Sequence, residues 1–478
     1  MSVKEISILK GGLFRTVSAT FIFVSCGLAA CSPVKEYSRP EVGLPSAYPG
    51  PVNNGKDLAT VPYRRFFTDP ELLALIDSAV AGNHDLLIAM KNIDYARESY
   101  DVAKLGFLPV ADLGASTNYS RASDNSSTAI NGQMRTSRNY TASLNASWEA
   151  DIWAKLKNRK KAALAEYLRS TDAARAVRTT LVSSVAQGYW NLQMLDAQLY
   201  ITRRNIALAD TTLTMMRLQF DAGNVTSLAV QQQESQLLSA KLSIPKLEAA
   251  RSAQENALSI LAGKMPGSVI KRSPGYVSVT VSDSHGAGVP LELLRNRPDV
   301  KAAEESLMQQ HASMGAAKAL LYPSLTVTAQ GGLNAIESNK WFSTPGSLFD
   351  SVQGSILQPL FRRGELKAGY EQSKIRRDQA ELTFRQTLFK AVGEGSNALV
   401  QVEQTGLQEG FAAQRVATLR QASANSRLLF QSGMATWLEV ITAESAQLQS
   451  ELELADVQRS HLSSMADLYR SVGGGWQE

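Results

Sequence analysis

Cysteine and histidine are scarce in this sequence, and their scarcity excludes several kinds of site. The 478 residues include two cysteines, Cys26 and Cys31, and Cys26 lies in a segment that we expect to be removed from the chain. The mature protein then has no disulfide. No cluster of cysteines or carboxylates accompanies the four isolated histidines, which are His84, His285, His311 and His461. We therefore expect no metal site, no catalytic site and no enzymatic activity.

Long apolar runs are missing beyond the N-terminus, and so is a strong excess of charge. No run of eighteen apolar residues occurs there, so we expect no transmembrane helix in the mature chain and any membrane crossing to be made by strands. The net charge of +5 is too small an excess to favour nucleic acid as a partner. A hydrophobic content of 44% with 19% charged residues indicates that most of the chain folds.

The N-terminus has the pattern of a secretory signal, because residues 1–30 combine basic side chains with an apolar run. The four residues Leu28-Ala29-Ala30-Cys31 resemble the lipobox of bacterial lipoproteins, in which the cysteine becomes the lipid-modified first residue. Leu28 is larger than the residue that ordinary signal peptidase prefers, which favours this interpretation. We expect a lipid anchor on Cys31 and no other cofactor.

Proline is absent from two long stretches. In the first, from Trp153 to Phe220, apolar residues recur at spacings of three, four and seven, which indicates one continuous helix. At 1.5 Å per residue such a helix reaches about 100 Å and must pack along partners of similar length. The second stretch runs from Phe361 to Phe430. Because one ends in Arg217-Leu218-Gln219-Phe220-Asp221-Ala222-Gly223 and the other in Arg427-Leu428-Leu429-Phe430-Gln431-Ser432-Gly433, we interpret the chain as a tandem duplication.

Turn residues and periodicity divide the chain into six segments. These are a signal segment 1–30, an extended arm 31–69, a first repeat 70–262, a linker 263–297, a second repeat 298–472 and a tail 473–478. The elements expected in the first repeat are helices 70–81 and 85–105, strands 108–121 and 139–151, a long helix 153–222 and a return helix 227–262. Those expected in the second are a helix 299–321, strands 323–334 and 348–360, a long helix 361–432 and a return helix 436–472. We expect the arm, linker and tail to lie together as a belt.

The four expected strands alternate between apolar and polar side chains. In the second strand, Tyr140, Leu144 and Trp148 share one face, and hydroxyl and amide side chains occupy the other. Two half-buried hairpins in a soluble sandwich would show the same alternation. The strand length nevertheless suits a tilted crossing of a bilayer, and the small polar side chains suit a water-filled lumen. Since four strands cannot close and an open edge is forbidden in lipid, several copies must share one sheet.

The whole pattern resembles the TolC-like outer-membrane efflux proteins, in particular the lipoprotein branch that serves resistance-nodulation-division pumps. The residues that carry this resemblance are Cys31 followed by Tyr37 and Pro40, Leu294-Arg295-Asn296-Arg297-Pro298-Asp299-Val300, Ala303-Glu304, the approach from Ala317 to Pro323, Gly433, and the ending Leu468-Tyr469-Arg470-Ser471-Val472-Gly473-Gly474-Gly475-Trp476.

The resemblance implies an α+β membrane protein with four transmembrane strands and long helices per protomer. A homotrimer would form a 12-stranded β-barrel in the outer membrane and a 12-helix α-barrel in the periplasm. The implied partners are a periplasmic adaptor, an inner-membrane transporter of the resistance-nodulation-division class and outer-membrane lipid, with no nucleic acid. The expected function is a passive, gated conduit that exports small molecules. Two alternatives stay open: an exit duct for type I protein secretion, and a trimeric lipoprotein that is only a structural spacer.

The helical turns at 217–226 and 427–436 are the expected contact with the adaptor. Glycines at 223 and 433 suit helix C-caps, and threonines at 226 and 436 suit the N-caps of the return helices. Good helix turns alone would explain these four residues, but not why an arginine and a phenylalanine recur before each glycine. By resemblance we assign the two turns to adaptor docking. The residues of this prediction are Arg217, Phe220, Gly223, Thr226, Arg427, Phe430, Gly433 and Thr436.

A ring of carboxylates is the expected gate at the periplasmic mouth. The family often carries carboxylates six and nine residues after the second turn glycine, and these positions hold Glu439 and Thr442 here. Glu444 lies close by in the sequence, and the matching place in the first repeat holds Ala229. Three Glu439 carboxylates in a narrow mouth would attract cations. We predict that Glu439 lines the constriction together with Leu438, Thr442 and Glu444.

Overall fold

The protein consists of two compact units, and each is built from several separate stretches of the chain. A computed structural model describes all residues except 1–32, 49–55, 124–135, 276–284, 287 and 478. The first unit comprises Met1–Pro40, Asp94–Leu168 and Glu305–Leu382, and the second comprises Glu41–Ile93, Arg169–Glu304 and Thr383–Glu478.

In each half of the chain, the described residues form short helices, then a pair of long strands, a long helix and a return helix. The helices are α2 (Tyr63–Phe66), α3 (Pro70–Gly82), α4 (His84–Leu105), α6 (Lys155–Asp221), α7 (Ser227–Leu261), α8 (Leu293–Asn296), α9 (Pro298–Ala319), α10 (Glu365–Gln431) and α11 (Trp437–Ser471), with short 3-10 turns η1 (Leu58–Thr60), η2 (Pro290–Glu292) and η3 (Ser338–Lys340). The strands are β1 (Lys56–Asp57), β2 (Val110–Arg121), β3 (Thr136–Ala150), β4 (His285–Gly286), β5 (Ser324–Ala335) and β6 (Leu348–Leu357).

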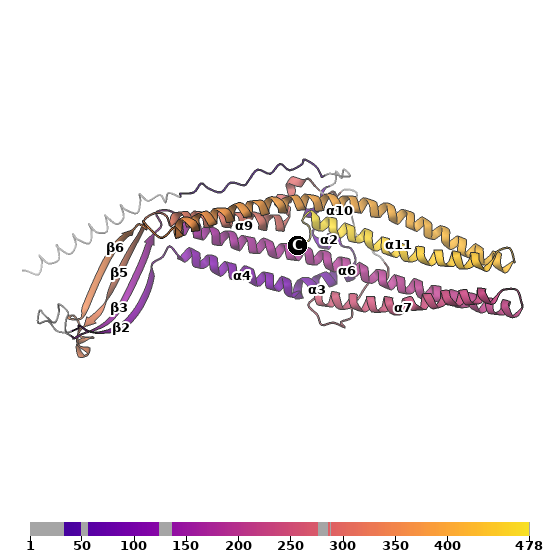
Figure 1. Ribbon diagram of the computed structural model, residues 1–478, viewed down its shortest axis with the longest axis horizontal. Coiled ribbons are helices and arrows are strands. Elements are labelled where there is room, and N and C mark those ends of the chain that lie inside the picture. Colours follow the sequence, from indigo (N-terminus) through magenta and orange to yellow (C-terminus); the bar gives the residue numbers. More distant parts are fainter. Residues whose placement is uncertain (1–32, 49–55, 124–135, 276–284, 287, 478) are drawn as a thin grey trace, which may run out of the picture. The chain divides into compact units, whose positions relative to one another are not determined.

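The two halves repeat at a constant spacing in the helices that follow the strands. Helices α6 and α10 both have 67 residues, and α10 begins 210 positions after α6. Helices α7 and α11 both have 35 residues and keep the same spacing. In the second unit, α6 with α7 and α10 with α11 form two antiparallel helical hairpins (Figure 1). Residues 210 positions apart can therefore be compared as equivalent positions.

The long helices begin later than the sequence pattern predicts, and local backbone geometry explains the difference. Helix α6 starts at Lys155 rather than at 153, because Ala154 has a left-handed backbone (φ 57°). The Asp151 carboxylate accepts from the backbone N–H groups of Leu156 and Lys157, each at 2.8 Å. Helix α10 starts at Glu365 rather than at 361, after left-handed residues at positions 363 and 364. Both helices end one residue before the predicted bounds of 222 and 432.

Smaller differences separate the other predicted bounds from the observed ones. Strand β6 ends at Leu357 rather than at 360, where Pro359 cannot donate a ladder hydrogen bond. Strand β3 begins at Thr136 rather than at 139. The other shifts are of one or two residues. They occur at the start of β2 and the end of β3, at both ends of β5, α9 and α11, at the start of α4 and at the ends of α3 and α7.

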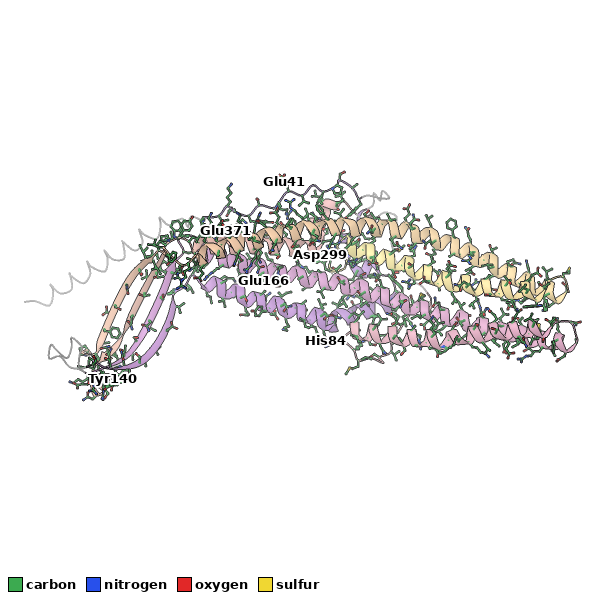
Figure 2. All side chains as sticks on the ribbon, in the orientation of Figure 1. Glu41, His84, Tyr140, Glu166, Asp299 and Glu371 are labelled. Atoms are coloured by element: carbon green, nitrogen blue, oxygen red, sulfur yellow. The ribbon has the colours of Figure 1, made fainter. Side chains whose placement is uncertain are left out.

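The first unit contains a four-stranded antiparallel sheet in the order β2-β3-β5-β6 (Figure 1). Directly paired residues include Leu113 with Leu144 and Ala146 with Ala329. The pairing places the apolar set of each strand on one face and the polar set on the other, as the alternation predicts. Tyr140 lies at the end of the sheet away from the helical part of this unit (Figure 2).

In the second unit, the return helix of each repeat meets the first helix of that repeat end to end. The Asn83 side-chain amide, just before α4, donates to the Leu261 carbonyl at the end of α7 (3.0 Å). The Arg297 guanidinium, just before α9, donates to the Ser471 carbonyl at the end of α11 (2.9 Å). These carbonyls occupy equivalent positions and would otherwise be unpaired helix-end acceptors. Both junctions therefore join a return helix to the first helix of its repeat end to end.

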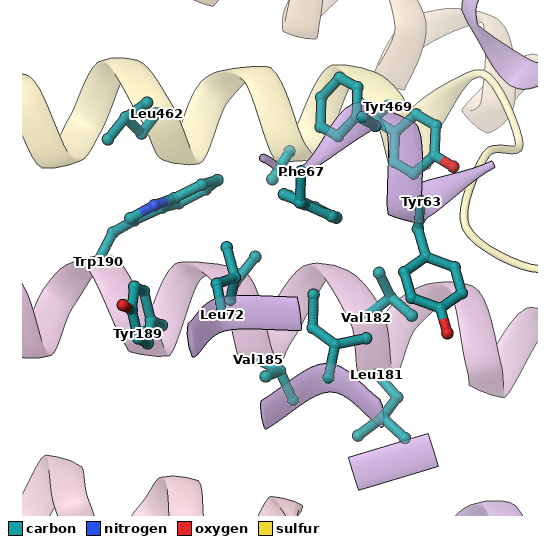
Figure 3. Packing of buried hydrophobic residues seen from close by; sticks show 14 of the residues in the cluster. Tyr63, Phe67, Leu72, Leu181, Val182, Val185, Tyr189, Trp190, Leu462 and Tyr469 are labelled. Carbon is teal, nitrogen blue, oxygen red and sulfur yellow. The ribbon is translucent and has the colours of Figure 1, made fainter. Parts of the chain in front are cut away.

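The main hydrophobic core lies in the second unit, where α2 and α3 pack against α6 and α11 (Figure 3). Trp190 is 1% exposed and its indole lies 6.0 Å from the Phe67 ring. The Tyr469 ring stacks on Phe66 at 4.2 Å, and its hydroxyl donates to the Val61 carbonyl. Burial of these aromatic side chains, together with the aliphatic side chains around them, holds the arm, the first repeat and the last helix together.

The belt expected from the sequence is present where the arm, linker and tail are described. Strand β1 of the arm pairs in parallel with β4 of the linker. The Trp476 indole N–H of the tail donates to the Asn296 carbonyl of the linker (3.1 Å). Among the described residues, no single helix has the length and hydropathy to span a membrane, and only the bent pair α3 and α4 passes that test when taken together.

Candidate conduit surfaces and helical tips

The two hairpins of the second unit end in the same helix-termination motif. Gly223 has φ 76° and Gly433 has φ 77°. Each glycine N–H bonds to a carbonyl three residues back, and the next residue's N–H bonds to a carbonyl five residues back: Gly223 to Phe220 and Asn224 to Gln219, Gly433 to Phe430 and Met434 to Leu429. This is the Schellman arrangement, which favours glycine at the left-handed position. The predicted C-caps are therefore confirmed.

The return helices are capped by threonines, but in two different ways. The Thr226 hydroxyl accepts from the Ala229 backbone N–H (3.3 Å) and so caps α7. At the start of α11, the Glu439 carboxylate accepts from the Thr436 backbone N–H (2.6 Å) and from the Thr436 hydroxyl (3.1 Å). This is the reciprocal half of a capping box, which satisfies an otherwise unpaired helix donor. Glu439 thus has a structural role in addition to its predicted place in the gate.

The recurring arginines brace the two hairpins at equivalent positions. The Arg217 guanidinium lies 3.6 Å from the Glu234 carboxylate of α7. Its counterpart Arg427 lies 3.8 Å from the Glu444 carboxylate of α11. Positions 234 and 444 are equivalent, so each repeat keeps one ion pair between its long helix and its return helix. The recurrence of arginine before each turn therefore has a structural explanation that does not require a partner.

Exposed apolar side chains surround both turns. Phe220 is 44% exposed, and Leu438 is 56% exposed. Three further side chains near the turns are more than 60% exposed: Leu218, Leu428 and Met434. Such apolar area at the ends of the hairpins is typical of a surface that another protein covers.

The four predicted gate residues do not share one environment. Leu438, Glu439 and Thr442 lie on the exposed side of the first turns of α11. The Thr442 hydroxyl donates to the Leu438 carbonyl of its own helix (2.7 Å). Glu444 is 5% exposed, and its carboxylate accepts from the Thr212 hydroxyl of α6 (3.3 Å). Glu444 therefore lies between helices in the protomer, whereas the other three side chains face outward.

Two buried carboxylates of α11 have pKa values shifted in opposite directions. Burial raises the pKa of Glu444, and Arg427 and Thr212 offset that effect only in part. Burial also acts to raise the pKa of Glu451, but hydrogen bonds from Arg420, Gln447 and Arg204 outweigh it and lower that pKa. Glu451 joins α11 to α6 and α10, with Arg420 Nε at 2.7 Å. Sequence reasoning missed Glu451, although its spacing of seven from Glu444 was a usable signal.

The sheet of the first unit has one polar and one apolar face. Across the four strands, one row of the polar face is Asp112, Asn145, Gln330 and Ser351. On this face the Gln330 amide donates to the Ser143 hydroxyl (3.0 Å), and the Asn334 amide donates to the Asn139 carbonyl (2.9 Å). Val110, Phe349 and Leu357 interrupt the polar pattern at or near strand ends. A face of small hydroxyl and amide side chains is suited to contact with water.

Asp112 and Glu149 are the two ionisable side chains on the polar face of β2, β3, β5 and β6. Glu149 forms an ion pair with Lys155 at the start of α6. Asp112 has no hydrogen-bond or ion-pair partner among the residues that the structure describes. On the apolar face, Arg138 lies over the Tyr119 ring (5.6 Å), and Asp350 lies two residues after the start of β6.

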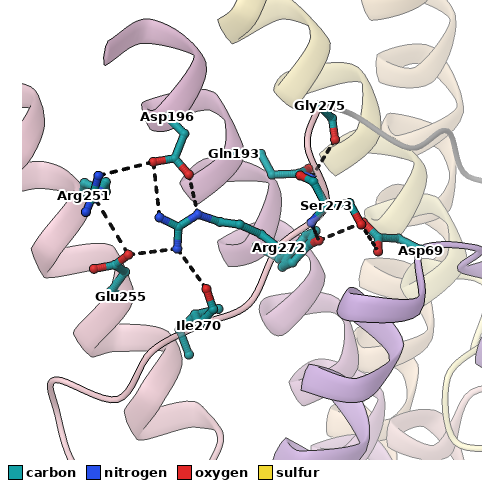
Figure 4. A network of polar contacts seen from close by, with 10 residues as sticks. Asp69, Gln193, Asp196, Arg251, Glu255, Ile270, Arg272, Ser273 and Gly275 are labelled. Carbon is teal, nitrogen blue, oxygen red and sulfur yellow. Dashed lines mark hydrogen bonds and ion pairs between the residues drawn. The ribbon is translucent and has the colours of Figure 1, made fainter. Parts of the chain in front are cut away.

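In the second unit, a polar network fixes the linker to α6 and α7 (Figure 4). The Arg272 guanidinium lies between Asp196 of α6 and Glu255 of α7, and its Nη1 is 2.9 Å from the Glu255 carboxylate. The same nitrogen donates to the Ile270 carbonyl (3.0 Å). Because both carboxylates are paired with Arg272, we interpret this network as structural rather than as a binding site.

The same linker is tied to the start of α3 through Tyr189. The Tyr189 hydroxyl donates to the Asp69 carboxylate (2.8 Å) and accepts from the Ser273 backbone N–H (2.9 Å). Burial raises the pKa of Tyr189 to about 12. The hydroxyl therefore stays protonated and acts as a fixed hydrogen-bonding group, with no role in proton transfer near neutral pH.

The described part of the arm is fastened to α9 in the first unit. The Lys318 ammonium donates to the Pro33 carbonyl (2.8 Å), and a ring nitrogen of His311 lies 3.0 Å from the Lys35 carbonyl. Cys31, the predicted lipidation site, lies outside the described residues, two positions before Pro33. Within the described residues, no group of three or more His, Cys, Asp or Glu side chains could hold a metal ion.

Comparisons with known proteins link this arrangement to outer-membrane transport. Residues 75–264 and 289–474 match the family described as outer membrane efflux protein. The cation efflux system protein CusC of Escherichia coli strain CFT073 is 28% identical over 462 residues, which cover 95% of this chain and 98% of that protein. The solvent efflux pump outer membrane protein SrpC of Pseudomonas putida is also 28% identical, over 95% of this chain and 97% of its own length.

A solved structure agrees with the fold as well. The crystal structure of a membrane protein from Pseudomonas aeruginosa superimposes with a TM-score of 0.86 at 26% identity. The superposition covers 93% of this chain and 100% of that chain. The likeness therefore includes both units and both repeats.

Proposed function

The chain belongs to the outer membrane efflux protein family, and from this premise we propose that three copies of it together form one passive exit duct. The protein is the outer-membrane channel component of an efflux system, with the fold of that class of channels. The proposal concerns how the channel is built, what it contacts and which of its residues select what passes.

The observation that carries the proposal is the four-stranded sheet with opposite faces. Among the described residues, β2 and β6 each pair with a strand on one side only, which leaves two open edges. Open edges are not tolerated in lipid, because the unpaired backbone groups find no water there. Pairing of β6 in one copy with β2 in the next would close the edges, and three copies give twelve strands. The apolar face then meets lipid, and the polar face encloses water.

The helical hairpins supply the periplasmic part of the duct and its contact with partners. Their exposed apolar turns support docking to a periplasmic adaptor, which would connect the duct to an inner-membrane transporter. The protein has no motif for nucleotide binding or hydrolysis, so the energy comes from that transporter. We propose no catalytic step for the duct itself. The names of similar proteins include both cation efflux and solvent efflux, so family membership alone does not fix the substrate.

Purified protein in planar bilayers tests this function. Detergent-solubilised protein is expected to cross-link as a trimer and to produce discrete conductance steps after insertion. A trimer without conductance would support the alternative of a structural spacer. A monomer would contradict the proposed closure of the sheet.

A further inference from the structure

The polar face of the sheet carries one uncompensated charge per chain. Asp112 shares a row with Asn145, Gln330 and Ser351. The amides of Asn145 and Gln330 both donate to the Ser143 hydroxyl, at 3.4 and 3.0 Å, and thus away from Asp112. The only other carboxylate on this face, in the strands as the structure describes them, is Glu149, and Lys155 neutralises it. No lysine or arginine of these strands lies on the polar face.

We propose that Asp112 is a selectivity residue inside the membrane part of the duct, where it makes the duct prefer cations over anions. The inference rests on the proposed function, because it requires the polar face to line the lumen. Three copies place three Asp112 carboxylates at one level of the closed sheet. Rings of Asp or Glu favour cations in channels, because they attract the permeating ion and repel anions.

The position of Asp112 explains why its charge acts on the lumen. It is the third residue of β2, and the side chain is exposed in the protomer. A carboxylate without a local counter-charge keeps its field, and at physiological ionic strength that field extends over about 8 Å. The hydroxyl and amide side chains around it carry no net charge. The preferred cargo at this level is therefore a cation or a molecule that carries a cationic group.

Asp350 provides a matched comparison within the same sheet. It has the same carboxylate but pairs with Gly331, in the row that holds Leu113 and Leu144 on the apolar face. Its side chain therefore points to the face opposite that of Asp112.

The test compares reversal potentials of the intact protein in planar bilayers under a KCl gradient. Asp112→Asn should lower the ratio of potassium to chloride permeability by about two-fold or more, and Asp112→Lys should shift it toward anions. Asp350→Asn should leave the ratio unchanged. Both asparagine variants are also measured in a second background that carries Glu439→Gln. In that background the predicted gate charge cannot mask a change in the permeability ratio. Cross-linked trimer and strand content by circular dichroism show that each variant has assembled.

Two results would overturn the inference while leaving the duct intact. One is a conducting Asp112→Asn trimer whose permeability ratio equals that of the unmodified protein in both backgrounds. The other is an equal shift caused by Asp350→Asn, which would mean that the two faces are not separated as proposed. A wild-type trimer that inserts without conductance would instead refute the proposed duct, and the inference with it.

Discussion

Arg297 joins the start of α9 to α10 and α11, and it is only 5% exposed. Its guanidinium contacts the Asp299 carboxylate (2.6 Å), the Glu394 carboxylate (2.9 Å) and the Ser471 carbonyl (2.9 Å). Asp299 is labelled in Figure 2 at this junction. Burial acts to raise the pKa of Asp299, but the hydrogen bonds and charge of Arg297 outweigh it and lower that pKa. The arginine of the motif that carries the family resemblance is thus a helix-end donor.

Replacing Arg297 should destabilise the second unit. Arg297→Ala removes the donor to the Ser471 carbonyl and to Asp299, and leaves Glu394 with only its longer contact to Arg470 (3.6 Å). The change should cost about 3 kcal/mol, the lower end of the range for a broken buried ion pair, because both carboxylates are partly exposed. Chemical denaturation of the detergent-solubilised protein measures the loss. The exposed neighbour supplies the control, since Arg295→Ala should have little effect. Equal losses from the two variants would contradict the role given to Arg297.

Glu439 can now be tested as a gate without disturbing the helix that it caps. Glu439→Gln keeps an acceptor for the Thr436 backbone N–H but removes the charge. If three Glu439 carboxylates guard the mouth, this variant should lower cation preference in single-channel recordings with little loss of stability. Thr436→Ala is the complementary control, because it alters the cap and retains the charge. Selectivity unchanged in Glu439→Gln would remove Glu439 from the gate.

At this scale, sequence reasoning predicts local roles better than distant ones. Gly223, Gly433 and Thr226 were identified as caps because their partners lie within a few residues. The burial of Glu444 against Thr212 depends on a helix more than two hundred residues away, and no local pattern reveals it. The adaptor-docking and gate assignments remain predictions.

Helix α11 offers two carboxylates that should respond to pH in opposite directions. The folded state lowers the pKa of Glu451 from 4.5, so its contribution to stability is present above that pH and is lost as the pH falls through the folded-state value. The folded state raises the pKa of Glu444 from 4.5, so its contribution to stability grows as the pH falls toward the unfolded-state value.

Glutamine variants separate the two cases. Glu451→Gln should destabilise the protein at pH 7 by about 1–3 kcal/mol, because two arginines lose a buried charged acceptor. That loss should begin to shrink below pH 4.5 and should disappear only as the pH falls through the lowered folded-state pKa of Glu451. Glu444→Gln should be neutral or stabilising at pH 7, since it removes the need to bury a charge. Denaturation midpoints at pH 7 and pH 4 measure both, and shifts of the same sign at pH 7 would contradict the assignment.

The helical turns should bind an adaptor through their phenylalanines rather than their arginines. Arg217 and Arg427 have partners inside their own hairpins, whereas Phe220 is 44% exposed. Phe220→Ser with Phe430→Ser should weaken binding of the cognate adaptor at least about tenfold in surface plasmon resonance, because exposed aromatics are frequent hot spots. Phe411→Ser is the control on α10, away from the turn, where the side chain is 68% exposed. Equal weakening by the control would argue against docking at the turns.

For whole elements, the hydrophobic period predicts whether a segment is a helix or a strand. It does not predict the residues at which the element begins and ends. The apolar spacings of three, four and seven predict the first long helix, and the lack of proline and the matching end predict the second. The alternation of apolar and polar residues predicts the strand faces, less cleanly at 348–360 than in the other strands. The starts of α6 and α10 were misplaced because Ala154 and Arg363 adopt left-handed backbones, which those residue types rarely do. These backbone conformations depend on packing at the strand-to-helix junction, and the residue types at these positions do not predict them.

At the scale of the whole molecule, the lipid anchor is the remaining prediction. Mass spectrometry of the mature protein should find Cys31 as the first residue, carrying a diacylglycerol and an amide-linked acyl chain. Cys31→Ser should lack this mass. Lys318 and His311 fasten the arm to α9 at Pro33 and Lys35, two and four residues after the predicted anchor. An unmodified Cys31 in the mature wild-type protein would contradict the prediction.

The constant spacing of 210 residues has a consequence for stoichiometry. A threefold assembly would display six helical turns of nearly the same shape. A partner that binds one turn would therefore have six binding sites on three chains. These sites would not be identical, because Glu439 after the turn of the second repeat corresponds to Ala229 after the turn of the first. Acidic and neutral binding sites would alternate around the assembly. Two copies of the same partner bound to one chain would therefore contact differently charged sites.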